Sequence, residues 1–319
     1  MKEKKMRKKK HRLRRLMFVL FFLMMFILAG WYIVLDGVYG KMNFQQIESL
    51  VQEEYKEDGV TNILLIGNDS RENGEDGRSD AMILLSISSK TKTIQMNSLL
   101  RDMYVEIPGY GGNRLNAAYA YGGPELLMET IELNFDVEVN RYMLVNFEAF
   151  ANLVDAVGGI ELEISAEEAK YINAYLVEYN MLTKKPEGTD YLSAEGGMVH
   201  LNGPQALAYS RNRYIGTDFG RTERQRKVLT AIIQKMPITM VTNPGQLLDG
   251  LLPNLTTNLQ KKECYMIGLN APGYLGYEIV TGSIPVEGSY KAATVRGMAV
   301  LEVDFEKNNT YLNNSIYGE

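Results

Sequence analysis

Alternating strand-like and helix-like patterns predict an α/β fold, an α-β-α sandwich around a central mixed sheet, preceded by one transmembrane helix. Short apolar runs of strand length recur between amphipathic stretches, which favours a sheet covered by helices. Two of these runs are joined by a four-residue polar turn at 89–92, so they are expected to form an antiparallel hairpin, which makes the predicted sheet a mixed one. A twenty-residue apolar segment near the N-terminus predicts the membrane helix.

The membrane signal occupies the first 35 residues, where ten of the first fifteen are Lys or Arg. The segment from Leu16 to Leu35 has no charged residue and spans about 30 Å as a helix, the thickness of a bilayer's hydrocarbon core. Trp31 and Tyr32 suit the far interface, and the basic block marks the near side as cytoplasmic. We expect an uncleaved, single-pass anchor in the cell membrane, with the C-terminal bulk extracellular. A cleaved signal peptide is the competing interpretation.

Charge is distributed unevenly along the chain. The whole sequence has 34 basic and 39 acidic residues, and the first fifteen hold ten of the bases and one acid, which leaves 24 and 38, or −14, for the remainder. Such an acidic domain repels DNA, and fifteen basic residues cannot build a DNA-reading fold, so no nucleic-acid partner is expected. Cys264 has no second cysteine with which to form a disulfide. The predicted domains are a cytoplasmic tail (1–15), a transmembrane helix (16–35), a juxtamembrane linker or stalk (36–60) and an extracellular catalytic domain (61–319).

Strands are predicted where short runs are continuously apolar or alternate with polar residues. In order along the chain they are expected at 63–66, 81–87, 93–100, 141–145 and 160–164. The stretch 165–197 is the least readable and is interpreted as a flap or an insertion. The C-terminal third, with short β-rich runs such as 277–281, is expected to form the far edge of the same domain.

Helices are predicted from apolar spacing and from their start and stop residues. One follows Pro124 and is expected to present an apolar face of Leu126, Leu127, Ile131 and Leu133. Others are expected at 147–157, from Asn202-Gly203-Pro204 onward, and from about 219 to 236, where Pro237 is expected to end the helix.

The loop between the first two predicted strands holds two acids, Asp69 and Asp80, and two bases, Arg71 and Arg78. If those strands are neighbours in one sheet, both aspartates lie at the same edge. Converging carboxylates repel unless a cation lies between them, and oxygen ligands beside arginines suit Mg²⁺ shared with a phosphate; Mn²⁺ accepts the same ligands. The alternative is a solvated loop in which the arginines only neutralise the aspartates.

The helix predicted from about residue 219 carries polar residues on its apolar face. At about 100° per residue, Arg221 and Gln225 fall on the side of the apolar residues. An inward arginine needs an anionic partner, and the start of the helix, which Asp218 is expected to cap, adds positive potential. Arg226 and Lys227 point elsewhere and are expected to be solvated.

Further arginines precede this helix. Arg211 and Arg213 share one face if their segment is extended, and the arginines together suit a polyanion bound through bidentate phosphate contacts. An internal salt-bridge network is the alternative. Earlier in the chain, Arg101-Asp102 directly follows a predicted strand, and Arg114-Leu115-Asn116 lies in a glycine-rich passage that is expected to come close to a ligand. No nucleotide-binding loop or hydrolase elbow is present, and the lone external histidine, His200, is expected at the surface.

Six short motifs in a fixed order resemble the LytR-CpsA-Psr family over roughly residues 61–236. They are Ile66-Gly67-Asn68-Asp69-Ser70-Arg71, Gly77-Arg78-Ser79-Asp80-Ala81-Met82, Ser98-Leu99-Leu100-Arg101-Asp102, Arg114-Leu115-Asn116-Ala117-Ala118, Arg211-Asn212-Arg213-Tyr214 and Asp218-Phe219-Gly220-Arg221-Thr222-Glu223-Arg224-Gln225. The resemblance implies a cell-envelope phosphotransferase that takes an anionic glycopolymer, such as a wall teichoic acid or a capsular polysaccharide, from a polyprenyl-pyrophosphate carrier. The product is a phosphodiester to peptidoglycan.

The resemblance also implies roles for individual residues. Asp69 and Asp80 would hold Mg²⁺, and the apolar interior of the sandwich would hold the lipid tail. Asp80, Arg78 and Asp102 are the candidate catalytic residues, with one of the two acids as general base. The residues expected to bind the pyrophosphate are Arg71, Arg78, Arg101, Arg114, Asn116, Arg211, Arg213, Arg221 and Gln225.

Two other functions use the same features. A Mg²⁺-dependent lipid pyrophosphatase would need the same phosphate contacts, with water as acceptor. A non-enzymatic regulator is the second alternative, because members of the family have been labelled transcriptional attenuators.

Overall fold

The computed structural model describes residues 36–37, 40, 43–44, 59–68, 79–243 and 255–318. Within these ranges, no helix combines the length and the apolar character that a membrane span requires. The predicted anchor at 16–35 and the basic tail at 1–15 lie outside the described residues. So do Asp69, Arg71, Arg78 and most of the predicted stalk.

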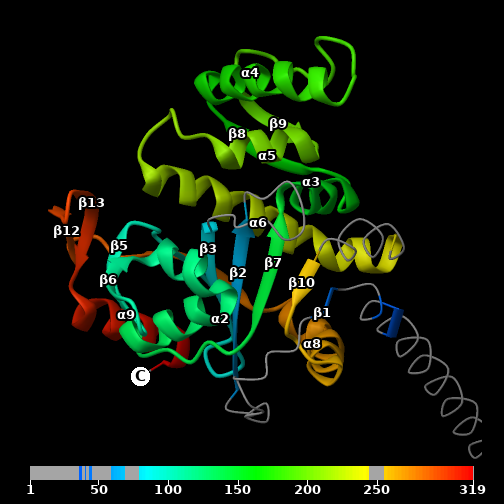
Figure 1. The fold of residues 1–319 in the computed structure, drawn as a ribbon. Coiled ribbons are helices and arrows are strands. Elements are labelled where there is room, and N and C mark those ends of the chain that lie inside the picture. Colours follow the sequence, from blue (N-terminus) through cyan, green and yellow to red (C-terminus); the bar gives the residue numbers. More distant parts are fainter. Residues whose placement is uncertain are drawn as a thin grey trace, which may run out of the picture.

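Among the described residues, seven strands form one mixed sheet at the centre of the fold (Figure 1), in the order β1-β10-β7-β2-β3-β4-β11. Antiparallel pairing joins β2 to β3 and β3 to β4, whereas β7 runs parallel to β2 and β11 parallel to β4. The predicted mixed sheet and its hairpin are therefore confirmed. The strands are Asn43–Phe44 (β1), Leu255–Thr257 (β10), Tyr142–Asn146 (β7), Val60–Asn68 (β2), Ser79–Ser88 (β3), Thr93–Leu99 (β4) and Glu278–Ile284 (β11).

The strands β2, β4, β7 and β11 point the same way, so their carboxyl ends meet at one edge of the sheet. Asn68 at the end of β2 pairs with Asn146 at the end of β7 and with Ser79 at the start of β3. Ile284 ends β11 beside Leu99, the last residue of β4. We call this the carboxyl edge. The segments predicted to carry the chemistry leave or enter the sheet here.

Helices α2 (Leu115–Phe135) and α9 (Phe305–Tyr317) cover one face of the sheet and share its main core. The non-helical dihedrals of Gly122 and Gly123 interrupt α2, and Pro124 begins its second segment, as the sequence predicts. Leu127 is fully buried, but Leu133 is 59% exposed. The predicted apolar face was wrong at Leu133, because six residues of helix turn it about 240° away from Leu127.

A second core lies beyond the carboxyl edge. It is built by α3 (Phe147–Ala156), α4 (Ala166–Leu182), α5 (Gly203–Arg211), α6 (Asp218–Thr242) and the hairpin of β8 (Ile160–Ile164) with β9 (Gly197–Leu201). Figure 1 shows this unit above the sheet, with α6 crossing the upper ends of β3, β2 and β7. The stretch 165–197, expected as a flap or an insertion, contains α4, which opens with a capping box between Ser165 and Glu168.

Helix α6 continues to Thr242, so the prediction that Pro237 ends it was wrong. Proline has no N–H, and the helix therefore loses the backbone bond to the carbonyl of Ile233 at that point. The chain nevertheless stays helical, and the Thr239 hydroxyl donates to the carbonyl of Lys235 at 3.2 Å one turn back.

A smaller sheet packs beside α9. Among the described residues it has four strands, in the order β12 (Tyr290–Val295), β13 (Met298–Val303), β5 (Met103–Ile107) and β6 (Gly111–Arg114). The hairpin between β5 and β6 explains the glycine-rich passage. Gly109 and Gly111 have positive φ angles in its turn, and a Cβ at Gly112 would collide with the Tyr104 hydroxyl. The passage is thus built for the hairpin, and Arg114 ends β6 as the chain enters α2.

The opposite face of the main sheet is apolar and incompletely covered by the described residues. Leu65 lies between Ile83 on β3 and Met143 on β7. Ile83 is buried, but Leu65, Met143 and the neighbouring Leu85 remain partly exposed. Toward the start of β2, a cavity of about 340 Å³ separates this face from helix α8 (Lys261–Tyr274).

Candidate functional site

Five charged side chains form a continuous ion-pair chain at the carboxyl edge. Nη1 of Arg114 lies 3.2 Å from Oδ1 of Asp102, and Nε of Arg101 lies 3.8 Å from Oδ2 of the same carboxylate. Nε of Arg101 also lies 3.2 Å from Oδ2 of Asp218. That oxygen lies 3.4 Å from Nη2 of Arg221. Three guanidiniums thus meet two carboxylates at one place in the fold.

Three separate segments deliver these residues. Arg101 and Asp102 follow β4, Arg114 ends β6, and Arg221 lies in the first turns of α6. Asn116 is buried, and its N–H donates to the carbonyl of Arg101 at 3.2 Å, which ties the start of α2 to the loop after β4. The structure therefore brings these five predicted site residues together, although they span 120 positions of the sequence.

Asp218 has a different role from the predicted one. Thr217 is the N-cap residue of α6, and no side chain caps the first turn. Asp218 instead lies within that turn and contacts Arg101 and Arg221. Arg221 is only 3% exposed, and this carboxylate compensates part of its charge. The helix start is therefore stabilised by the site itself rather than by a capping bond.

Arg226 is buried, and the prediction that it is solvated was wrong. Its side chain is 8% exposed, and its Nη1 donates to the hydroxyl of Ser98 on β4 at 2.8 Å. Burial lowers the pKa of the Arg226 guanidinium, and Glu223 partly offsets that effect. Helix α6 is covered from two sides, by the second core and by the sheet, so a single apolar face did not describe it. Lys227 is 51% exposed and pairs with Glu223, as a solvated lysine should.

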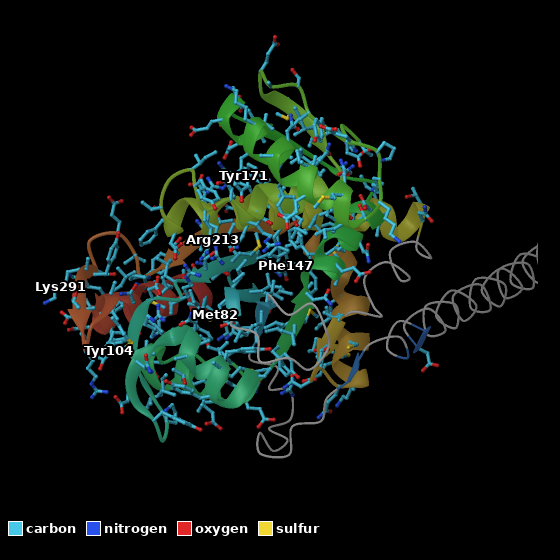
Figure 2. The ribbon with its side chains drawn as sticks, turned by 45° about the horizontal axis from the view of Figure 1, so that its top comes forward. Met82, Tyr104, Phe147, Tyr171, Arg213 and Lys291 are labelled. Carbon is cyan, nitrogen blue, oxygen red and sulfur yellow. The ribbon has the colours of Figure 1, made fainter. Side chains whose placement is uncertain are left out.

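Arg211 and Arg213 do not lie on one extended segment. Arg211 ends α5, and Asn212 follows as its C-cap residue. The guanidinium of Arg211 stacks on Phe147, with 4.0 Å between its central carbon and the ring centroid. Phe147 directly follows Asn146 at the carboxyl edge, so Arg211 lies beside the end of β7. Figure 2 labels Arg213 and Phe147 between the second unit and β3, the strand that carries Met82.

Arg224 is an important residue that sequence reasoning named only as part of a motif. Its Nη2 donates to the carbonyls of Asn212 and Ile215, both at 2.8 Å, and its Nη1 lies 3.6 Å from Oε1 of Glu168. The residue is 6% exposed. Arg224 thus fixes the loop 212–217, which carries Arg213, and joins it to the start of α4. The sequence shows Arg224 only as one more arginine in the cluster, because its partners at positions 168, 212 and 215 are distant in the sequence.

Asp80 is placed by its backbone. It follows Ser79 at the start of β3, opposite the end of β2, where the register shifts between Gly67 and Asn68. Asp69 comes directly after Asn68 in the sequence but lies outside the described residues. The prediction that β2 and β3 are neighbours, which would return both aspartates to one edge, is met by the strand pairing. Arg71 and Arg78 belong to the loop between β2 and β3, which lies outside the described residues.

The donor chemistry around this loop fits a hard divalent cation. Within the described residues, no three acidic, histidine or cysteine side chains gather closely enough to hold a metal ion. The candidate ligands Asp69 and Asp80 offer carboxylate oxygens, the donors that Mg²⁺ prefers, and a diphosphate would supply the remaining oxygens. His200 is absent from this edge; it lies at the surface and pairs with Glu161 on the β8–β9 hairpin.

Comparison with known sequences places this geometry in context. The model of the LytR_cpsA_psr family matches residues 38–315. Polyisoprenyl-teichoic acid–peptidoglycan teichoic acid transferase TagU of Oceanobacillus iheyensis is 33% identical over 277 residues, which cover 84% of this chain and 78% of that protein. The TagU of Enterococcus faecalis is 37% identical over 214 residues, and the match spans 65% of this chain and 64% of the length of that relative.

Solved structures share the fold. A structure described as TagT bound to LI-WTA superposes with a TM-score of 0.66 at 27% sequence identity, and the match covers 86% of this chain and 99% of that one. A second, described as the LytR-CPS2A-psr family protein YwtF (TagT) with bound octaprenyl pyrophosphate lipid, has a TM-score of 0.61 at 26% identity and covers 83% of this chain and 95% of that one.

Proposed function

We propose a function for this chain from its membership of the LytR_cpsA_psr family, to which it belongs. It transfers an anionic glycopolymer of the teichoic acid or capsular type from a polyprenyl-pyrophosphate carrier to peptidoglycan, with formation of a phosphodiester. The single observation that carries the proposal is the ion-pair chain, in which Arg101, Arg114 and Arg221 converge at the carboxyl edge. The two TagT structures are described with LI-WTA and with octaprenyl pyrophosphate lipid bound, which supports a polyprenyl-pyrophosphate-linked donor for this chain.

The ion-pair chain is suited to a diphosphate because it is a preformed set of donors. Phosphoryl transfer depends mainly on alignment and charge neutralisation, and arginines bind phosphate oxygens in pairs. In our proposal Arg101, Arg114 and Arg221 bind one side of the diphosphate and exchange part of their pairing with Asp102 and Asp218 for phosphate. The remaining residues predicted to bind the pyrophosphate are Arg71, Arg78, Arg211, Arg213 and Gln225, of which Arg71 and Arg78 lie outside the described residues.

The reaction consists of one substitution at phosphorus. An acceptor hydroxyl attacks the phosphorus that bears the glycopolymer, the bridging P–O bond breaks, and polyprenyl phosphate leaves. The hydroxyl proton passes to a carboxylate. Asp80 and Asp102 are the two candidates for this base; Asp102 contacts two guanidiniums, and Asp80 is also a proposed metal ligand. Arg78 then stabilises charge on the transferring phosphoryl group.

We also propose Mg²⁺, with Mn²⁺ as a substitute, held by Asp69 and Asp80. When bound, the cation neutralises charge on the diphosphate oxygens. The chain's own contribution is to bring two carboxylates to one edge through the pairing of β2 with β3, as their backbone register supports.

The lipid tail is proposed to lie along the second face of the main sheet. Leu65, Leu85 and Met143 are apolar and partly exposed there, and the face leads to the carboxyl edge through Gly67 and Ala81. Burying such side chains against polyprenyl groups gains about 25 cal/mol per Å² of apolar surface. We further propose that residues 16–35 anchor the chain in the cell membrane, with the tail cytoplasmic and the domain extracellular, where a membrane-held donor is within reach.

Polymer transfer in vitro tests this function. The full-length chain in detergent is mixed with polyprenyl-pyrophosphate-linked polymer and peptidoglycan, and attached phosphate is measured. Asp80→Ala and Arg78→Ala should each lower transfer at least about 100-fold while circular dichroism and thermal unfolding stay unchanged. Lys227→Ala is the control, because Lys227 is exposed and lies outside the site. Transfer that persists in the two site variants would refute the assignments, and release of phosphate unattached to glycan would identify a pyrophosphatase instead.

A further inference from the structure

An aromatic stripe runs along α4, away from the carboxyl edge. Tyr171, Tyr175 and Tyr179 recur every four residues, so they follow one side of the helix at about 6 Å per step. The rings of Tyr175 and Tyr179 stack with 6.3 Å between centroids. At the other end, the ring of Tyr214 from the loop 212–217 lies 5.7 Å from that of Tyr171. We call these four residues the tyrosine stripe.

The tyrosine stripe begins at the candidate site. The guanidinium of Arg211 lies 5.7 Å from the ring centroid of Tyr175, and its Nη1 donates to the Tyr175 hydroxyl at 3.4 Å. Both Arg211 and Arg213 influence Tyr171 electrostatically, and Tyr171 and Arg213 lie near each other in Figure 2. Arg211 therefore contacts the stripe on one side and Phe147, at the carboxyl edge, on the other. A ligand on the stripe would end at the proposed phosphate site.

The loop that presents Tyr214 is firmly built. Tyr214 is 86% exposed, so the apolar surface of its ring is open to a ligand. The backbone N–H groups of Tyr214 and Ile215 both donate to the Asn212 side chain, at 3.0 and 3.1 Å. Arg224 holds the same loop through two carbonyls and reaches Glu168 at the start of α4. Arg224 thus fixes the position of the loop 212–217 relative to α4, the two segments that carry the stripe.

We propose that the tyrosine stripe binds the sugar rings of the acceptor glycan strand and aligns one of its hydroxyls with the phosphoryl group. This inference rests on the proposed transferase function and names the acceptor subsite of that same site. Pyranose rings present an apolar C–H face that packs on aromatic rings, while tyrosine hydroxyls hydrogen-bond to sugar hydroxyls. The step of about 6 Å along the helix is close to the length of one pyranose unit, so successive tyrosines lie level with successive sugars. Tyr175 and Tyr179 are partly buried against the second core, and their hydroxyls and exposed edges are the parts that a sugar can contact.

Charge at the far end of the stripe favours the acceptor over the anionic donor polymer. Burial raises the pKa of Tyr179, and Tyr175 and the carboxylates of Asp155, Asp190 and Glu148 raise it further. Lys185 offsets one of them, with its Nζ 3.8 Å from Asp190 and 5.6 Å from the Tyr179 ring. A polymer with a phosphate on every repeat would be repelled there. A glycan strand without phosphate would not.

Binding of two polymers to the full-length chain in detergent tests the inference without turnover. The first probe is peptidoglycan glycan strands freed of peptide and of teichoic acid, and the second is soluble poly(glycerol phosphate). Isothermal titration with each probe is carried out on the wild type, Tyr214→Ala and Tyr179→Leu. Tyr110→Ala is the matched control, because Tyr110 is also exposed (58%) and stacked on another tyrosine, but lies on the β5–β6 hairpin.

We expect each stripe variant to raise the Kd for glycan strands about three- to tenfold, as the loss of one aromatic contact predicts, and to leave the Kd for poly(glycerol phosphate) unchanged. Tyr110→Ala should change neither. Unchanged glycan binding in Tyr214→Ala, which cannot unfold a core, overturns the inference even where polymer transfer works. Weaker binding of poly(glycerol phosphate) alone also overturns it. Loss of glycan binding in stripe variants of a chain that fails to transfer polymer would uphold the stripe and reject the transferase function.

Discussion

Replacing Arg226 by methionine should leave the fold about as stable as before. The guanidinium is 8% exposed and donates to the Ser98 hydroxyl at 2.8 Å, and its Nε makes no hydrogen bond with a described residue. Losing a hydrogen bond to a charged group costs about 1.5–3 kcal/mol. Removing an incompletely paired buried charge in favour of an apolar side chain has returned about 1–4 kcal/mol in other proteins. The two terms cancel to within about 2 kcal/mol, and methionine adapts its shape to the space.

A charge that is buried without benefit to stability is expected to serve binding. Arg226 follows Gln225 on α6 and faces the sheet, so we expect Arg226→Met to weaken binding of a polyprenyl pyrophosphate about tenfold or more, the value of one charge-assisted hydrogen bond. Thermal unfolding and lipid binding are measured on the same preparations, with Lys227→Met as the neighbouring exposed control. A loss of more than about 3 kcal/mol in the free energy of unfolding would assign Arg226 to the fold. Unchanged lipid binding would refute the functional part of the reasoning.

Three further predictions follow from buried groups. Arg224→Ala should lower the free energy of unfolding by about 3–5 kcal/mol, because two hydrogen bonds to backbone carbonyls and the ion pair with Glu168 are lost together. Lys227→Ala, the control, should lower it by less than about 1 kcal/mol. Equal losses for the two variants in urea denaturation would contradict this prediction. Burial raises the pKa of the Cys264 thiol to about 11, so little reactive thiolate is present at pH 8. Iodoacetamide at pH 8 should therefore modify Cys264 at least about tenfold more slowly in the native chain than in urea. Similar rates in the two conditions would contradict this prediction. Burial also raises the pKa of Tyr209 to about 12, above its unfolded value of about 10. The neutral Tyr209 therefore contributes fully to the free energy of unfolding below pH 10, and this contribution is lost as the pH rises to about 12. Urea denaturation between pH 9 and 12 should show this fall in the free energy of unfolding, and a flat profile would contradict it.

The centre of the fold could be predicted because its signals are local. Strands β2, β3 and β4 are continuous apolar or alternating runs joined by recognisable polar segments, and each local pattern agrees with the final pairing. The position of β11 beside β4 could not be predicted in this way. Its parallel partner lies 185 residues earlier, at Thr93 opposite Glu278, and no local pattern encodes a pairing over such a distance.

The candidate site could be predicted in part for a similar reason. Arg101 and Asp102 were found because charged residues directly after a strand end must emerge at a sheet edge, and the structure joins them to Arg221 through Asp218. The role of Asp218 was missed because an acid at a helix start resembles a cap. Arg226 was misplaced because a helix covered on two sides has no single buried face from which to read its orientation.

The position of β1 at the edge of the main sheet limits the distance between the domain and the proposed membrane anchor. Asn43 and Phe44 pair with Thr256 and Thr257 at the outer edge of the main sheet, so the chain is attached to the sheet before the predicted catalytic domain (61–319) begins. With the proposed anchor ending at Leu35, only residues 36–42 form the tether, and eight peptide steps extend at most about 29 Å. The proposed anchor would therefore keep β1 within about 29 Å of the membrane surface, on the side where the donor is held.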